Sequence, residues 1–227
     1  MLKQDFKKFI SYFKKSFYLI VFIGFSNVFA GSYDDFFSAI VQDDAKAVAA
    51  LLKRGFDGNT VNAAGEPGLM LAITAASFKV ATVLLDSPNT KAEVRNAADE
   101  NPLMLAALKG ELELCRLLIK KGADVNKPGW APLHYAATNS HLAIMQLFLD
   151  ENAYIDAASP NGTTPLMMAA HYGTAEAVKL LLETGADPVL KNELGLSAID
   201  FANRGNRVDS ANIISAAVRD RQPKGTW

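Results

Sequence analysis

The sequence predicts an all-α protein built as a solenoid of stacked helix–turn–helix units. The first observation is that the chain resembles itself: segments that begin at Leu69, Leu103, Leu133 and Leu166 align with one another, and a weaker copy begins at Ala198. The steps between matching positions are 34, 30, 33 and 33 residues, a period typical of one supersecondary unit stacked many times. The second observation is that each copy joins an Ala-rich run to a Leu-rich run, which favours closely packed helices.

The first thirty residues have the three-part order of a secretory signal peptide. Residues 1–15 are rich in Lys, residues 17–25 carry no charge, and Val28 and Ala30 have the small-residue spacing of a signal-peptidase site. An apolar run of about 9–14 residues is shorter than the roughly 20 that a transmembrane helix needs. We therefore expect cleavage after Ala30 and a periplasmic or secreted protein. The alternative is an uncleaved signal anchor.

The first helix of each copy is predicted to begin after a capping side chain. Asn101 precedes Pro102, and Thr164 precedes Pro165. The side-chain oxygen of such a residue accepts a hydrogen bond from an otherwise unpaired amide, and Pro at the first helical position has no amide to leave unpaired. Ser197 could cap the last copy in the same way.

The second helix of each copy is predicted to end at a residue that tolerates a left-handed backbone, a common way for a helix to stop. Glycine takes this conformation freely, and Asn takes it more readily than other residues. The residues in this position are Gly55, Gly122, Asn152 and Gly185.

Five motifs recur in register along the chain: TPLMMAA (164–170), APLHYAA (131–137), NPLMLAA (101–107), KKGADVN (120–126) and ETGADP (183–188). Together they resemble the ankyrin repeat over roughly residues 32–219. The resemblance implies paired antiparallel helices linked by outward-projecting β-hairpin loops. We therefore expect a signal peptide at 1–30, then an ankyrin-repeat domain at 31–219 with about four full repeats between N- and C-terminal half-repeats. A flexible tail is expected at 220–227, and the signal peptide indicates an exported bacterial protein.

Some positions depart from this pattern. Pro88 stands where Gly is expected, and because Pro cannot adopt a positive φ the turn there must differ. Ala131 removes the capping hydroxyl before the third full copy. The connection from Gly122 to Gly129 is three residues shorter than the ten-residue spacing in other copies. This shortened loop should leave a notch in the row of loop tips.

Composition and charge argue against several classes of function. Outside residues 1–30, 18 basic and 23 acidic side chains give a formal net charge of −5, whereas nucleic-acid binding needs a clustered basic face. The single cysteine, Cys115, cannot form an intramolecular disulfide and is predicted to be a small buried side chain. The sequence contains no recognisable nucleophile elbow, phosphate-binding loop or carboxylate pair, so we expect neither catalysis nor a cofactor.

The three histidines are the remaining candidates for chemistry. None has a partner at the spacing of metal ligands, so we expect no metal site. The resemblance places His134 at the His of the family's TPLH motif, where the ring braces the loop and the helix backbone. It gives His141 a structural place after the turn between helices, and it maps His171 to the concave face.

The family's partner-binding positions flank the glycine at each loop tip and close the first helix of each copy. Trp, Tyr and Arg are the residues most often found as interface hot spots. We expect Trp130, His171 and Tyr172 to border one groove together with Leu108; the alternative is that Trp130 folds back on the neighbouring loop. The residues predicted to bind a partner are Trp130, His171, Tyr172, Leu108, Lys109, Asn139, Leu194, Leu196 and Arg204.

A solenoid without a catalytic set is by default a binding surface. We therefore expect a monomeric, non-catalytic module of the bacterial envelope that engages a protein through its concave face and loop tips. No contact is expected with nucleic acid or, after cleavage, with the membrane. The alternatives are an immunity or inhibitor protein that occludes a toxin or an envelope enzyme, an enzyme, and a scaffold held by an uncleaved N-terminus.

Overall fold

A computed structural model describes residues 31–221 of the chain. The expected signal peptide with its cleavage site after Ala30, and residues 222–227 of the expected tail, lie outside the described residues. The last helix includes residues 220 and 221, which the sequence assigned to the tail. In chain order the helices are residues 31–41, α2 (Ala45–Lys53), α3 (Gly68–Thr74), α4 (Phe78–Asp86), α5 (Pro102–Lys109), α6 (Leu112–Lys120), α7 (Pro132–Thr138), α8 (Leu142–Asp150), α9 (Pro165–Tyr172), α10 (Ala175–Thr184), α11 (Ala198–Arg204) and α12 (Val208–Arg221).

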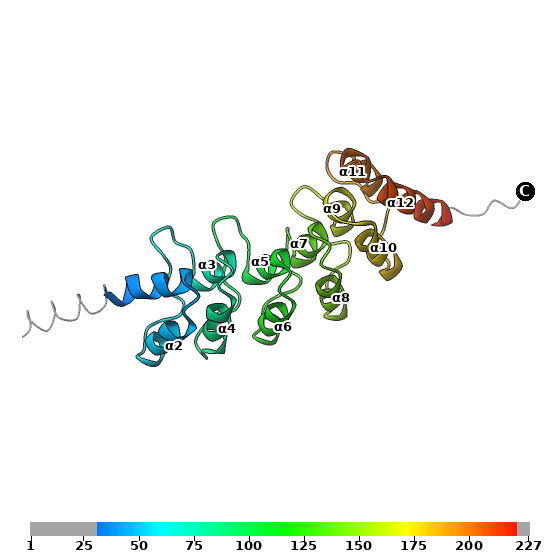
Figure 1. Ribbon diagram of the computed structural model, residues 1–227. Coiled ribbons are helices and arrows are strands. Elements are labelled where there is room, and N and C mark those ends of the chain that lie inside the picture. The colour runs from blue at the N-terminus through cyan, green and yellow to red at the C-terminus, as the bar shows by residue number, and fades with distance from the viewer. Residues whose placement is uncertain (1–30, 222–227) are drawn as a thin grey trace, which may run out of the picture.

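The helices form antiparallel pairs that stack side by side along one axis (Figure 1). The first helices of the pairs, α3, α5, α7, α9 and α11, form one row. The second helices form the other row: α2, α4, α6, α8, α10 and α12. The loops between pairs project beyond the row of first helices. The predicted all-α solenoid is therefore confirmed. We call the surface formed by the first helices and the loops the inner face.

Alanine side chains let the first helices approach one another closely. From α5 onward the first helices pack more extensively on each other than the second helices do. This difference curves the stack toward the inner face. The Leu-rich second helices fill the space between the two rows, and Leu118 and Leu181 are fully buried there. The alanines with no exposed surface are Ala106, Ala107, Ala136, Ala137, Ala169 and Ala170.

The predicted caps form at the helix starts, with one variation. The Asn101 side chain accepts a hydrogen bond from the amide three residues on at 2.9 Å, and Thr164 Oγ1 does the same at 3.4 Å. Ser197 donates instead: its amide and its hydroxyl both bond to the Asp200 carboxylate, at 2.8 and 2.7 Å. These two bonds hold the pKa of Asp200 below its usual value.

The ends of the second helices follow the prediction. Gly55, Gly122 and Gly185 have φ of 89°, 91° and 113°, and Asn152 has φ of 63°. After α4, Ser87 is extended, with φ of −68° and ψ of 129°. The chain therefore leaves α4 without a left-handed residue, as the following Pro88 requires.

Tight turns close the loops that project from the inner face. Extended pairing among residues 31–221 is limited to isolated antiparallel bridges, Val61 with Pro67 and Lys191 with Ser197, so the expected β-hairpins are very short. The loop before α7 is shorter than its neighbours in Figure 1 and lacks the bond that closes the others. That bond runs from a turn amide to the carbonyl four residues on, and it starts at Asn62, Asn96, Ser159 and Asn192.

Candidate partner-binding face

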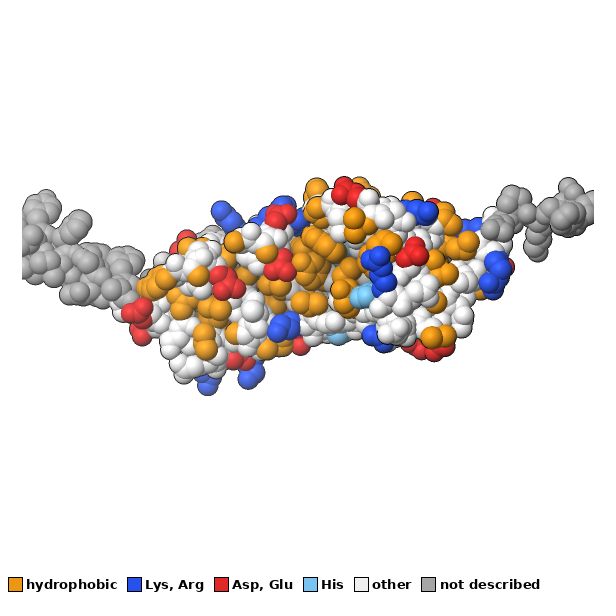
Figure 2. Space-filling view, turned by 90° about the horizontal axis from the view of Figure 1, so that it is seen from above, with side chains coloured by type: hydrophobic (Ala, Val, Ile, Leu, Met, Phe, Trp, Pro, Cys, Tyr) orange, Lys and Arg blue, Asp and Glu red, His pale blue; other side chains and the backbone are white. Residues whose placement is uncertain are grey.

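A pocket of about 240 Å³ opens on the inner face near the middle of the stack. Helices α5, α7 and α9 supply its walls, together with the short loop before α7. Figure 2 looks onto the inner face and shows hydrophobic side chains gathered over the middle of the stack. The lining residues are Leu108, Trp130, His134, Tyr135, Thr138 and Met168.

His134 joins the short loop to the helix that follows it and to the next loop. The ring is fully buried; its Nδ1 accepts a hydrogen bond from the Ala131 amide at 3.1 Å, and its Nε2 donates to the Thr163 carbonyl at 2.9 Å. These partners assign a neutral ring with its proton on Nε2. Burial lowers the pKa of His134 from its ordinary value. The bracing role that the resemblance implies is confirmed.

The other polar groups that α7 contributes to the pocket also have partners. The Tyr135 hydroxyl donates to the Glu100 carboxylate at 2.9 Å. The Thr138 hydroxyl donates to the His134 carbonyl at 2.8 Å. A side chain that entered the pocket would therefore meet mainly carbon atoms, and the hydroxyl protons of α7 are already donated to other groups.

Trp130 stands at the pocket because it belongs to the short loop, directly before α7. Its ring packs edge-to-face on His134, with the ring centroids 5.2 Å apart, and it remains partly exposed. Trp130 and Leu108 line the same pocket, as expected. The ring of Trp130 thus covers the start of α7 and also presents a surface on the inner face.

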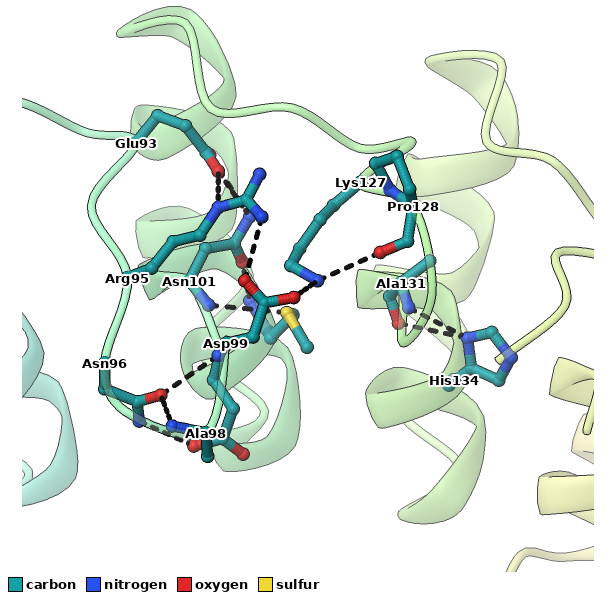
Figure 3. Close-up of polar contacts among 12 residues, drawn as sticks. Glu93, Arg95, Asn96, Ala98, Asp99, Asn101, Lys127, Pro128, Ala131 and His134 are labelled. Atoms are coloured by element: carbon teal, nitrogen blue, oxygen red, sulfur yellow. Dashed lines mark hydrogen bonds and ion pairs between the residues drawn. The ribbon is translucent and has the colours of Figure 1, made fainter. Parts of the chain in front are cut away.

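A buried lysine joins the short loop to the preceding loop (Figure 3). The Lys127 ammonium donates to the Asp99 carboxylate and to the Pro128 carbonyl, the latter at 3.0 Å, and only 2% of the Lys127 side chain is exposed. Asp99 also accepts a hydrogen bond from Arg95 at 2.8 Å. The bonds from Lys127 and Arg95 hold the pKa of Asp99 below its usual value. Lys127 therefore supports the loop that is three residues shorter than its counterparts in other repeats.

Three of the predicted partner-binding residues lie at the ends of α5 and α7. Leu108 lines the pocket, and Lys109, the last residue of α5, is exposed. Within residues 31–221 no carboxylate lies within ion-pair distance of Lys109. Asn139 is exposed and donates to the Leu108 carbonyl at 2.8 Å, so it also holds the end of α5.

His171 and Tyr172 end α9 and do not line the pocket. The His171 Nδ1 donates to the Phe201 carbonyl at 3.0 Å, so the ring is tied to α11 of the next repeat. Tyr172 packs edge-to-face on His171 at 4.2 Å between ring centroids and is 53% exposed. The single groove expected for these residues is therefore divided. Leu108 and Trp130 share the pocket, and Tyr172 is an exposed ring outside it.

The remaining predicted residues belong to the last repeat. Leu194 stands at the tip of the loop before α11 and is 74% exposed. Leu196 is partly buried, and its amide and carbonyl both bond to Asn192, which closes the turn. Arg204 is the exposed last residue of α11. None of the three lines the pocket.

Sequence reasoning did not identify Tyr135 and Met168 as residues of this surface. Both stand two positions after the first leucine of their copy, next to the paired alanines. A single copy of the repeat predicts that such a position is buried in the core, because the helix around it is apolar. The signal in the alignment of the copies is a large apolar residue that recurs at this position, and the structure leaves each of these side chains partly buried: Leu71, Leu105, Tyr135, Met168 and Phe201.

The groups with reactive chemistry lie apart from this pocket. Cys115 is fully buried in α6, as predicted, and burial raises the pKa of its thiol to about 12. Among residues 31–221, no three His, Cys, Asp or Glu side chains are grouped so that they could hold a metal ion. The helices of this part of the chain include none with the length and apolar character to cross a membrane.

The chain is similar to the ankyrin-repeat regions of longer proteins. It is 29% identical over 161 residues to the nuclear factor NF-kappa-B p105 subunit of Gallus gallus, a match that covers 68% of this chain and 16% of that protein. A putative ankyrin repeat-containing protein of Treponema pallidum (strain Nichols) is 28% identical over 185 residues, covering 77% of this chain and 60% of that protein. The chain therefore spans less than two thirds of the length of these relatives.

This chain is also similar to a chain in a solved structure, over most of the length of both chains. That chain is from the complex of a predatory endopeptidase of Bdellovibrio bacteriovorus with an immunity protein, and it matches with a TM-score of 0.70 and 28% identity over 80% of this chain and 97% of that chain. The family model described as ankyrin repeats (3 copies) matches residues 36–128, 69–159 and 133–218. These overlapping matches extend from the first described helix into α12. The chain belongs to the ankyrin-repeat family.

Proposed function

We propose that this chain is a non-catalytic module that binds a protein partner through its inner face and loop tips. Ankyrin repeats are protein-binding modules, and the family match covers nearly all of the described residues. The observation that carries the proposal is the apolar pocket on the inner face. Covering such a surface releases ordered water, and exposed apolar patches of this kind mark interaction sites on soluble proteins.

Two aromatic residues are the expected anchors. Trp130 lines the pocket, and Tyr172 is an exposed ring at the end of α9. An aromatic side chain at the centre of an interface buries a large apolar area at little cost in side-chain entropy. The exposed Leu194 at a loop tip extends the proposed surface beyond the pocket.

The test requires the partner, which can be captured from an envelope extract with the full chain as bait and identified by mass spectrometry. Titration calorimetry with the purified partner should then show that Trp130→Ala or Tyr172→Ala lowers affinity at least about tenfold, because truncation of a hot-spot residue costs about 2 kcal/mol or more. Lys179→Ala is the control, since Lys179 is exposed on α10 and its ion pair within residues 31–221 is with Glu183, at 3.7 Å. Unchanged affinity in both aromatic variants, with the fold intact by circular dichroism, would contradict the proposal.

A second candidate function is that of an immunity protein that occludes an endopeptidase. The observation that favours it is the similar solved structure, which is a complex of an endopeptidase with an immunity protein. The match covers 97% of the similar chain in that complex. The test is a hydrolysis assay with an endopeptidase encoded beside this chain in its genome. Inhibition at equimolar chain, relieved by Trp130→Ala, would support this function. Full endopeptidase activity at saturating chain would exclude it for that enzyme.

We also propose that the protein is exported and loses residues 1–30. The support is the sequence alone, namely the Lys-rich start, the uncharged run and the spacing of Val28 and Ala30. Intact-mass measurement on the envelope fraction should give a chain that begins at Gly31. Recovery of the uncleaved chain from the membrane fraction would instead support the signal anchor.

A further inference from the structure

We propose that the inner-face pocket receives one bulky apolar side chain from an extended segment of the partner, and that a carboxylate next to that side chain pairs with Lys109. This inference rests on the proposed protein-binding function and adds the chemistry of the bound segment. Three features of the described residues support it: the size and lining of the pocket, a free donor at Trp130, and the charges on its two sides.

The size and the lining of the pocket select a single apolar side chain. Its volume of about 240 Å³ lies below the roughly 300–1,000 Å³ of pockets that enclose small molecules. Leu108 and Met168 offer only apolar side chains, and the Tyr135 hydroxyl is already bonded to Glu100. A polar group buried among these carbon atoms would lose most of its water, which is unfavourable. A Leu or Phe side chain has no polar group to lose its water in this way.

Trp130 offers a hydrogen-bond donor beside the pocket. Within residues 31–221 its indole N–H has no acceptor, although the ring packs on His134 and remains partly exposed. The indole N–H of an interface tryptophan usually finds a polar partner. A backbone carbonyl of an extended segment that crosses the pocket would supply one.

The charges on the two sides of the pocket differ in sign. Glu100 lies on the loop side, just before α5, where it accepts hydrogen bonds from Tyr135 and from Asn96 at 2.9 and 2.8 Å. Lys109 lies at the opposite end of α5 and has no ion-pair partner in the described part of the chain. A carboxylate of the partner is therefore attracted to the Lys109 side and repelled from the Glu100 side. The two charges give the bound segment a direction.

The length of α5 sets the spacing in the bound segment. A helix of 8 residues is about 12 Å long at about 1.5 Å per residue. An extended chain covers that length in three to four residues at about 3.3 Å each. With the apolar side chain in the pocket between Glu100 and Lys109, a carboxylate about one or two positions away reaches the Lys109 ammonium. The segment is thus a bulky apolar residue with an acidic neighbour on one side only.

The test is a selection of random linear peptides, displayed on phage, against the immobilised full chain. The wild-type chain should enrich peptides with a bulky apolar residue and an acidic neighbour. Lys109→Glu should lose that acidic preference, and its affinity for a wild-type consensus peptide should fall at least about threefold, as expected for a partly solvated ion pair. Lys120→Glu is the matched control, because it makes the same charge change at the exposed end of α6. Trp130→Ala should not enrich these peptides.

The outcomes separate this inference from the proposed function. Peptides with the apolar residue but no acidic excess, or equal effects of Lys109→Glu and Lys120→Glu, would overturn the carboxylate pairing and leave protein binding intact. Enrichment of the same peptides by Trp130→Ala, or of no peptides by the wild-type chain, would overturn binding of a segment in the pocket. The calorimetry with the captured partner judges the proposed function independently of these results.

Discussion

His134 holds the short loop to α7 and to the next loop, and the hydrogen bond that its Nδ1 accepts from the Ala131 amide requires a neutral ring. Its Nδ1 must accept the Ala131 amide and its Nε2 must donate to Thr163. A proton on Nδ1 would remove the acceptor and place a charge on a fully buried ring, and this burial lowers the pKa of His134. One buried ring therefore ties the stability of the central repeats to pH.

This coupling predicts a loss of stability on mild acidification. In the unfolded chain His134 binds a proton as the pH falls through about 6.5, whereas in the folded chain it does so only at lower pH. The contribution of His134 to the free energy of unfolding should thus be fully present above about pH 6.5 and be lost as the pH falls below that value toward the lower pKa of the folded state. Urea titrations at several pH values measure it. His134→Gln should be less stable at neutral pH and show a flatter dependence; an equal dependence in wild type and variant would contradict the assignment.

The pair formed by Lys127 and Asp99 predicts an asymmetry between its two partners. The Lys127 side chain is 2% exposed and the Asp99 side chain is 62% exposed. Asp99→Asn should destabilise the protein more than Lys127→Met, because it leaves a buried ammonium without its carboxylate, whereas Met removes the charge and keeps the volume. Asn also tolerates the φ of 60° at this position, so the backbone is not disturbed. Urea melts that rank the two variants in the reverse order would contradict this explanation.

At the scale of the elements, helix α7 begins where its own sequence lacks the usual cap. Ala131 has no side-chain acceptor, yet α7 starts at Pro132 as predicted. His134 in the first turn accepts the Ala131 amide, in the same way that Asp200 accepts the Ser197 amide in α11. The His134 amide, which a capping side chain would otherwise bind, donates to the Ala131 carbonyl at 3.0 Å, so both amides have acceptors although Ala131 has no side-chain oxygen.

The second helices carry the repeated leucines, and Leu181 in α10 is fully buried. Leu181→Ala should lower the free energy of unfolding by roughly 2–5 kcal/mol, because it removes buried carbon atoms and leaves a cavity between packed helices. Lys179→Ala on the exposed side of the same helix should change it by less than about 0.5 kcal/mol. Denaturant melts measure both, and a loss below about 1 kcal/mol for Leu181→Ala would mean that the position is not packed as described.

At the scale of the whole molecule, the extensive contacts between helix pairs within residues 31–221 run between neighbours along the stack. The stability of such a solenoid is close to a sum of repeat and neighbour terms, so the two ends, which have one neighbour each, are the least stable parts. Amide hydrogen exchange should be slowest in α5 to α9 and faster in residues 31–41, α2 and α12. Mass spectrometry of exchanged peptides measures this order. Slower exchange in α12 than in α7 would show that the end repeat does not depend on its neighbour in this way.

The sequence by itself determined the period, the helix pairs and their ends. Caps such as Asn101, stops such as Gly185 and the alternation of Ala-rich and Leu-rich runs act within a few residues of chain, so they can be read without the fold. The same reasoning found Trp130 and Leu108 on one surface and gave His134 its bracing role. The signal peptide stays a prediction from the sequence.

Only the tertiary structure decided which side chains form the pocket. Its walls come from three first helices and one loop, so residues about thirty positions apart, such as Leu108, Tyr135 and Met168, meet only when the repeats stack. The same stacking ties His171 to α11 and leaves Tyr172 outside the pocket. It also buries Lys127 against Asp99, a pairing that bridges two loops. Contacts within a repeat follow from local periodicity, whereas contacts between repeats depend on how closely neighbouring helices approach, which no single copy of the repeat encodes.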